Sequence, residues 1–361
     1  MRIFYFCFLT ILTFSTSCIS RADVDRNNNY QVSSSLYGVI RNYGFGFGGV
    51  LKLWEKKFQQ YHPGVKFQDT LITSDAAFPA LVTGVTDLAP DGGEPAITEL
   101  LSFYETYGYH ATGIIVASGT YDVEGRSPGI IVYVHPDNPI TQLTLDQLDG
   151  IFGSERNGAL RGFKWDLNAS RTNDKNIRVW GDLGLKGEWA DKPIQTYGHA
   201  PSGTTRFFQL RVLHNSDKWN PNYKGYVETG SKMIDDSDKI TQHGGIQYML
   251  QNELLANKYG IAWTIYPQAS KIPGIKAIAL SATANGPFIA PSKSSFKDRT
   301  YPLVRNLYFY INRKPGTIIN PKLKEFLTFI LSNQGQAIID ENGSYLSLPI
   351  SEIKKQLKLL N

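Results

Sequence analysis

Residues 36–67, LYGVIRNYGFGFGGVLKLWEKKFQQYHPGVKF, decide the fold of this chain. A strand over 36–40 leads into a glycine-rich segment over 44–49. Apolar residues then recur at the helical period of about 3.6 and predict a helix over 50–61: Val50, Leu51, Trp54, Phe58 and Tyr61. His62-Pro63-Gly64 ends this helix, and a second strand begins at Val65. Two strands joined by one helix form a βαβ unit, which predicts parallel pairing.

The rest of the chain continues this alternation. Further helices are expected over 77–84, 97–107 and 321–339, and Thr144-Leu145-Asp146-Gln147 has the spacing of a capping box that opens another helix. Strands are expected over six further segments: 87–89, 113–117, 129–134, 260–263, 276–280 and 307–311. We therefore predict an α/β fold with mixed, mainly parallel sheets flanked by helices.

Composition excludes several classes of protein. The 361 residues are 42% apolar, which excludes a disordered chain, and 33 Gly with 18 Pro argue against a helical bundle. The length suggests about two domains. The net charge of +5, from 37 Lys+Arg against 32 Asp+Glu, is dispersed, so no nucleic-acid partner is expected.

Residues 1–22 are predicted to form a secretory signal peptide. Arg2 precedes an apolar block over 3–14, and Ser20-Arg21-Ala22 offers small residues for cleavage after Ala22. The block is shorter than the ~18–20 residues of a membrane span. An alternative is lipid attachment at Cys18. Either process predicts a periplasmic or extracellular protein.

Both cysteines, Cys7 and Cys18, lie in this segment. Cleavage after Ala22 would leave no disulfide, thiol nucleophile or cysteine-bound metal, and would lower the charge from +5 to +3 by removing Arg2 and Arg21. The six histidines show no metal-ligand spacing, and no nucleophile elbow or phosphate-binding P-loop motif occurs. We therefore expect no metal, no cofactor and no enzymatic activity.

The glycine-rich segment Gly44-Phe45-Gly46-Phe47-Gly48-Gly49 permits three interpretations. With Asp69, 20 residues after Gly49, it matches a dinucleotide fingerprint. More broadly, a glycine-rich turn before a helix directs free N–H groups and a positive dipole end at an anion. The third interpretation is a tight turn under an aromatic cover.

A second candidate loop opens another predicted helix: Ser202, Gly203, Thr204, Thr205 and Arg206. Hydroxyls here lie beside unpaired helix N–H groups, and Gly203 allows close approach of a ligand. The alternative is that Ser202 or Thr204 only caps the helix.

Thr73-Ser74 precedes the helix expected from residue 77 and offers a third set of donors, unless Ser74 is an ordinary N-cap.

Asp91 follows a strand and is a further candidate for ligand binding. A carboxylate at an oxyanion site accepts a hydrogen bond only from a protonated ligand, so it would favour hydrogen phosphate over sulfate. The alternative is that Asp91 lies in a solvated turn and contacts no ligand.

The order of several segments resembles the phosphate-binding proteins of bacterial ABC transporters, which have the type II periplasmic binding protein fold. The segments that carry the resemblance are 54–65, 81–89, 137–153, 180–184, 202–208, 259–262 and 301–303. The resemblance implies two lobes around a cleft: lobe one over 34–118 and 264–361, and lobe two over 119–263. It also implies that Gly44-Phe45-Gly46, Thr73-Ser74, Asp91 and Ser202-Gly203-Thr204 bind the ligand.

Two positions depart from that family. Its third loop carries Ser-Asp, or Gly-Arg-Glu in a related branch, where this chain has Asp91-Gly92 and Gly92-Gly93-Glu94. The family also carries an Arg four residues before Ser-Gly-Thr, where this chain has Gly198. Residues that could replace this guanidinium are Arg206, His199 and Arg126.

The function expected from the resemblance is capture of phosphate or a similar small oxyanion by a monomer, for the membrane subunits of an ABC transporter. Hinge closure would provide the mechanism. The departures leave open a binding-fold protein for another solute, or an extracytoplasmic sensor. A secreted phosphatase is the rival from another class, although no nucleophile motif supports it.

Overall fold

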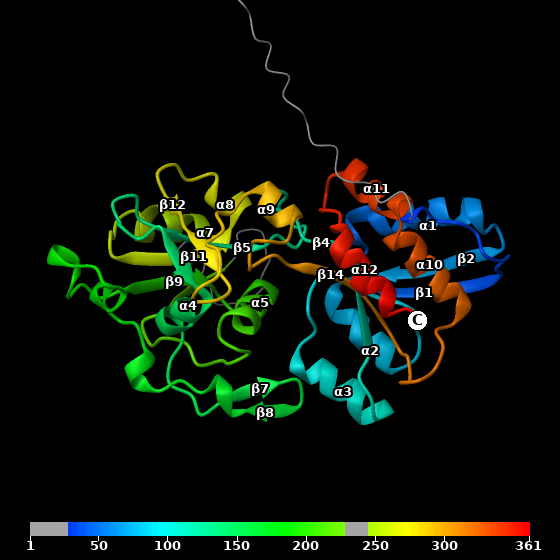
Figure 1. Cartoon of the computed structure of the whole chain (residues 1–361), viewed down its shortest axis with the longest axis horizontal. Coiled ribbons are helices and arrows are strands. Elements are labelled where there is room, and N and C mark those ends of the chain that lie inside the picture. The colour runs from blue at the N-terminus through cyan, green and yellow to red at the C-terminus, as the bar shows by residue number, and fades with distance from the viewer. Residues whose placement is uncertain (1–27, 228–244) are drawn as a thin grey trace, which may run out of the picture.

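The computed structural model describes residues 28–227 and 245–361, which form two lobes (Figure 1). Each lobe has its own hydrophobic core, one containing Trp54 and Phe326 and the other Trp180 and Trp263. The predicted signal peptide lies outside the described residues. Within those residues, no helix combines the length and apolar character needed to span a membrane.

The first lobe combines the N-terminal and C-terminal parts of the described chain (Figure 1). Its strands are β1 (Gly38–Gly44), β2 (Val65–Leu71), β3 (Ala89–Asp91), β4 (Thr112–Ser118) and β14 (Asn306–Ile311). Its helices are α1 (Val50–Tyr61), α2 (Ala77–Val82), α3 (Ile97–Tyr107), α10 (Pro321–Leu331), α11 (Asn333–Asn342) and α12 (Ile350–Lys358). β1 and β2 pair in parallel, with Gly38 opposite Val65, so the predicted βαβ unit is confirmed.

The second lobe is formed by the middle of the chain. Its strands are β5 (Ile130–Val134), β6 (Gln142–Thr144), β7 (Ala159–Arg161), β8 (Lys164–Asp166), β9 (Gln195–His199), β10 (Lys224–Tyr226), β11 (Gly260–Ile265), β12 (Lys276–Ala277) and β13 (Ala279–Ser281). Its helices are α4 (Leu145–Phe152), α5 (Gly203–Arg211), α7 (Ile246–Tyr248), a π-helix (Met249–Leu254), α8 (Tyr266–Ala269) and α9 (Lys293–Lys297). The main sheet has the strand order β10-β9-β11-β5-β12.

The α/β class is confirmed, but the sheets contain more antiparallel pairing than expected. β9 pairs in parallel with β10 and β11, whereas β5 runs antiparallel to β11. In the first lobe, β14 is antiparallel to both β3 and β4. Among residues 28–227 and 245–361, the chain leaves the first lobe after β4 and returns to it before β14 (Figure 1). Both of these strands, and β5 in the second lobe, run antiparallel to strands beside them.

The structure places the second lobe boundary later than the expected residue 264. Ile272, Ile278, Leu280 and Phe296 are buried in the core of the second lobe, and β12 extends its sheet by pairing with β5. The chain therefore returns to the first lobe just before β14. Apolar burial assigns 266–303 to the second lobe, because these side chains complete its core.

The helix expected over 321–339 is two helices, α10 and α11. Ser332 has an extended backbone between them, and its side chain accepts a hydrogen bond from the Gly335 N–H. This cap satisfies a free N–H at the start of α11 and so stabilises a break between two helices. The apolar residues keep a helical spacing on both sides of Ser332, so the sequence pattern does not reveal the break. The capping box predicted at Thr144 and Gln147 is confirmed at the start of α4.

Candidate ligand-binding site

The glycine-rich segment is a tight turn between β1 and α1. Gly44 has φ +147°, and a Cβ at this position would lie 2.3 Å from the Pro90 carbonyl oxygen. The next residue, Phe45, donates its N–H to that carbonyl at 2.8 Å. Glycine thus lets the end of β1 approach the turn that carries Asp91 closely.

Ser74 and Asp91 belong to one hydrogen-bonded turn. The Gly92 N–H donates to Ser74 Oγ at 3.0 Å, and the Gly93 N–H donates to Asp91 Oδ1 at 3.1 Å. Asp91 is only 3% exposed, so it does not lie in a solvated turn. Burial raises the pKa of Asp91 to about 7, although the hydrogen bonds from Gly93 and Ser74 and the charge of Arg206 act in the opposite direction.

The hydroxyl-rich loop starts α5, as predicted. Ser202 is the N-cap, and its Oγ accepts from the Thr205 N–H at 3.2 Å. Thr205 Oγ1 donates to the Ala200 carbonyl at 2.6 Å, which ties the helix to the end of β9. Gly203 faces open space, since a Cβ there would meet no atom within 4 Å. The first turn of α5 is therefore capped on one side and open to a ligand at Gly203.

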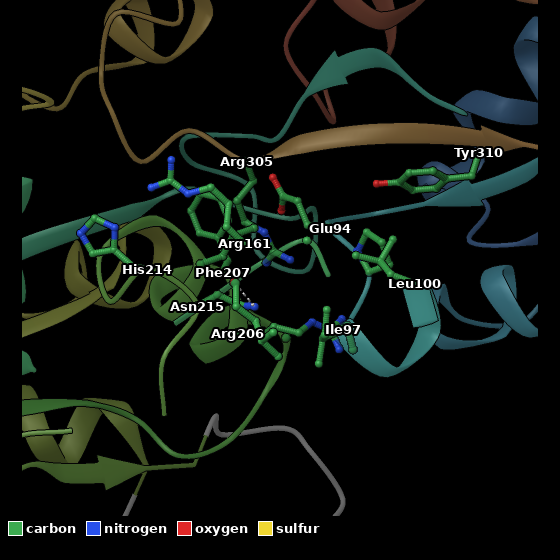
Figure 2. Close-up of a pocket in the computed structure, with 16 residues that line it drawn as sticks. Glu94, Ile97, Leu100, Arg161, Arg206, Phe207, His214, Asn215, Arg305 and Tyr310 are labelled. Carbon is green, nitrogen blue, oxygen red and sulfur yellow. Dashed lines mark hydrogen bonds between the residues drawn. The ribbon is translucent and has the colours of Figure 1, made fainter. Parts of the chain in front are cut away.

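A pocket of about 480 Å³ lies between the lobes (Figure 2). The first lobe lines it with Glu94, Pro95, Ala96, Ile97, Leu100 and Tyr310. The second lobe lines it with Leu160, Arg161, Gly162, Gly203, Arg206, Phe207, Leu210, His214 and Asn215. Arg305, at the crossing between the lobes, completes the lining. Three arginines face one glutamate, Glu94, so the pocket has an excess of positive charge.

The structure brings only part of the predicted set together. Gly44, Phe45, Ser74 and Asp91 adjoin one another in the first lobe. Across the gap, Gly203 and Arg206 line the pocket, and the Arg206 charge acts on Asp91.

The remaining predicted residues contribute differently. A Cβ at Gly46 would lie 3.4 Å from the Leu71 side chain, and Thr73 is exposed. Thr204 and Thr205 are buried at the start of α5. These positions support the loops around the pocket.

The dinucleotide interpretation gains no support. Asp69 is ion-paired with Lys52 and accepts a hydrogen bond from Asn42 Nδ2 at 2.9 Å, so its carboxylate is engaged within the first lobe. Phe45 packs edge-on against Phe47, and Phe47 against Trp54. The turn thus has the aromatic cover that the third interpretation expected.

The space around Gly198 explains why this position holds no arginine. A Cβ on Gly198 would lie 2.4 Å from Trp263 and 2.5 Å from Tyr223 Oη. Its neighbour His199 is also buried, with its ring stacked on Trp263 at 4.9 Å and Nε2 2.9 Å from Thr264 Oγ1. His199 thus lies in the second lobe's core and does not replace the missing guanidinium.

The other two candidates for this replacement lie in different places. Arg126 packs against the glycine-rich turn, where its Nε is 2.4 Å from the position of a Cβ on Gly48. Of the three predicted substitutes, Arg206 alone lines the pocket.

Sequence reasoning missed Arg305, Phe207 and Glu94 as pocket residues. Arg305 closely follows Tyr301-Pro302-Leu303, a segment that carries the resemblance. The expected lobe boundary at residue 264, however, put Arg305 well inside the first lobe, so the sequence did not indicate that it lies where the chain crosses between the lobes. Phe207 is an apolar residue of α5 with only 2% exposure, so its residue type alone indicates a core position.

Comparisons with known proteins agree with this architecture. Residues 45–334 match the model of the PBP superfamily domain. The phosphate-binding protein PstS of Pseudomonas aeruginosa is 30% identical over 333 residues, covering 92% of this chain and 90% of the relative. This chain belongs to the PBP superfamily, in the family of PstS.

The chain is also similar to two further proteins. PstS of Staphylococcus aureus is 28% identical over 182 residues, which cover 50% of this chain and 47% of the relative. The crystal structure of PstS from Borrelia burgdorferi is 14% identical, has a TM-score of 0.51, and matches over 86% of this chain and 98% of its own. At this identity, the structural likeness supports the fold alone.

Across 28–227 and 245–361, no group of three or more His, Cys, Asp or Glu side chains is arranged to hold a metal ion. The charged side chains that line the pocket include Arg161, Arg206, Arg305 and Glu94.

Proposed function

We propose that this chain is an exported receptor that captures phosphate in its interlobe pocket and presents it to the membrane subunits of an ABC transporter. One observation carries the proposal. Glu94, which follows the turn of the buried Asp91 in the first lobe, and Gly203, at the start of α5 in the second lobe, line one pocket, and the charge of Arg206 acts on Asp91. PstS relatives that match most of the chain support the choice of phosphate.

The recognition is by hydrogen bonds and charge. The open first turn of α5 offers N–H donors and the positive end of the helix dipole. Arg206 adds a fixed positive charge, and the carboxylate of Asp91 accepts a hydrogen bond from the hydroxyl of hydrogen phosphate. The bound ion stabilises the closed arrangement because it contacts both lobes there. No covalent bond is made or broken in this recognition, so we propose a binding protein and no enzyme. We also propose that it acts as a monomer, since one chain supplies both lobes around the pocket.

Isothermal titration of the chain lacking residues 1–22 with inorganic phosphate tests this function. We expect saturable binding with one site and a rise in thermal stability. An absence of heat and of thermal shift at millimolar phosphate would favour a receptor for another solute. Turnover of a chromogenic phosphate ester would instead indicate a phosphatase.

A further inference from the structure

The interlobe pocket extends well beyond the turn proposed to bind phosphate. Gly203 lines it at the start of α5, and Arg206 and Leu210 line it further along the same helix. Leu210 follows Gly203 by seven residues, which is a rise of about 10 Å in an α-helix. His214, which follows α5, lines the pocket beyond this. A phosphate ion at Gly203 therefore occupies one end of the pocket only.

The volume of the pocket also exceeds what a single small ion needs. Its volume of about 480 Å³ lies within the ~300–1,000 Å³ that are typical of sites for small organic molecules. A lone phosphate ion is much smaller and would leave most of this volume to solvent. The pocket thus has room for an organic group attached to the phosphate.

Apolar side chains from both lobes line much of this space (Figure 2). Ile97 and Leu100 lie three residues apart on α3, so they share one face of that helix. Phe207 and Leu210 have the same spacing on α5 of the second lobe, and β7 adds Leu160. Apolar walls favour contact with carbon-containing groups, because this contact removes apolar surface from water. The lining therefore fits a short carbon chain better than it fits a free ion.

Hydrogen-bonding side chains with little net charge line the pocket at the end of α5. Burial lowers the pKa of His214, although the charge of Asp149 acts in the opposite direction, so its ring is mostly neutral at pH 6.5 and above. A neutral imidazole has one donor and one acceptor, and the amide of Asn215, which also lines the pocket, has both kinds of group. Arg161 of the lining is paired with Asp166 at 3.1 Å. Hydroxyl groups, which both donate and accept, match these side chains.

We propose that the pocket binds a small phosphate monoester whose organic group carries hydroxyl groups. The phosphate lies at the first turn of α5, and the organic group extends along the helix towards His214. This inference rests on the proposed function, because it places the phosphate of the ester where that function places the free ion. A receptor with this pocket takes up both ligands and distinguishes esters by the size and polarity of the organic group.

The proton shared with Asp91 comes from the protein when the ligand is an ester. Hydrogen phosphate carries a hydroxyl that donates to the Asp91 carboxylate, whereas the dianion of a monoester has none. Burial raises the pKa of Asp91 to about 7, so its protonated form prevails at pH 6.5 and can donate to an ester oxygen. The ester is therefore best tested at this pH.

Calorimetric titration with sn-glycerol 3-phosphate at pH 6.5 tests this inference. We expect saturable binding that inorganic phosphate displaces, because the two ligands share the phosphate position. Propyl phosphate has a carbon chain of the same length without hydroxyl groups, and we expect it to bind ~2–10-fold more weakly. L210W places a larger side chain in the pocket at a residue that is 37% exposed. It should weaken glycerol 3-phosphate binding at least ~5-fold more than it weakens phosphate binding.

L53W is the matched control. Leu53 is 42% exposed on α1 of the first lobe, outside the lining of the interlobe pocket, so this variant should change the affinity for either ligand less than about twofold. If the wild type binds phosphate but not glycerol 3-phosphate, or if L210W weakens both ligands equally, the inference is wrong and the receptor function stands. Propyl phosphate that binds as tightly as glycerol 3-phosphate would overturn the assignment of hydroxyl groups. If the wild type binds neither phosphate nor ester, both the inference and the proposed function are wrong.

Discussion

The ring of Phe163 stacks on the imidazole of His110, with centroids 4.7 Å apart and planes at 16°. Phe163 is at the tip of the β7–β8 hairpin in the second lobe, and His110 lies between α3 and β4 in the first (Figure 1). Tyr104 of α3 packs on the same ring at 4.8 Å. An aromatic clasp of Phe163, His110 and Tyr104 therefore joins the lobes at the edge of the pocket.

Removing this clasp should favour the open arrangement. We expect F163A to weaken phosphate binding by up to ~5–150-fold, because it removes two aromatic pairs that contribute about 0.5–1.5 kcal/mol each to the closed state. Small-angle scattering should show a larger radius of gyration for the ligand-free variant. W165A is the control, since Trp165 lies on the same hairpin with 58% exposure. Equal radii and affinities for F163A and wild type would contradict the role of the clasp.

Asp91 should make selection against sulfate depend on pH. Its pKa is raised to about 7, so the carboxyl is increasingly protonated below pH 7 and charged above it. The protonated form can donate to sulfate, whereas the carboxylate repels it. We expect sulfate to compete with phosphate more strongly at pH 6 than at pH 8.

The D91N variant separates this carboxyl from other titrating groups. It should bind sulfate with little dependence on pH, since its amide can donate throughout this range. Competition titrations at both pH values measure the effect. A pH dependence in D91N equal to that of wild type would assign the effect to another group.

A side chain at position 198 should destabilise the second lobe. A Cβ there would overlap Trp263 and Tyr223, so we expect G198A to lower the free energy of unfolding by about 1–3 kcal/mol. G198R should be worse, despite restoring the family's arginine. Urea unfolding measures both variants. G203A is the control for stability, because a Cβ at Gly203 meets open space and Ala favours a helix over Gly.

The buried carboxylate of Asp149 should be essential for the stability of the second lobe. Asp149 is 1% exposed and accepts hydrogen bonds from Arg156 Nη1 at 2.7 Å and Arg171 Nη2 at 2.7 Å. Its removal would leave two buried guanidinium groups without their shared counter-charge. We expect D149A to cost about 3–5 kcal/mol.

Thermal or urea unfolding of D149A tests this expectation. D137A, which removes a carboxylate whose side chain is 74% exposed, should change stability by less than about 0.5 kcal/mol. A D149A variant as stable as D137A would show that the arginines find other partners.

Local sequence patterns predicted much of the fold. The βαβ unit over 36–67, the capping box at Thr144 and the cap of α5 at Ser202 were all predicted from neighbouring residues. The break at Ser332 was missed because a capped break can preserve the apolar period of a helix. Of the residues predicted for the site, Gly203 and Arg206 line the interlobe pocket, and Ser74 and Asp91 are hydrogen-bonded to the turn that precedes Glu94.

The sequence by itself determined the α/β class, the order of the elements and the loops at the ends of strands. These features depend on hydrogen bonds and apolar periods within short segments. Only the tertiary structure decided that 266–303 belong to the second lobe, that Asp91 is buried, and that Arg305 lies between Gly93 and Phe207. The physical reason is that burial and electrostatic surroundings arise from contacts between residues distant in the chain, which no local pattern specifies.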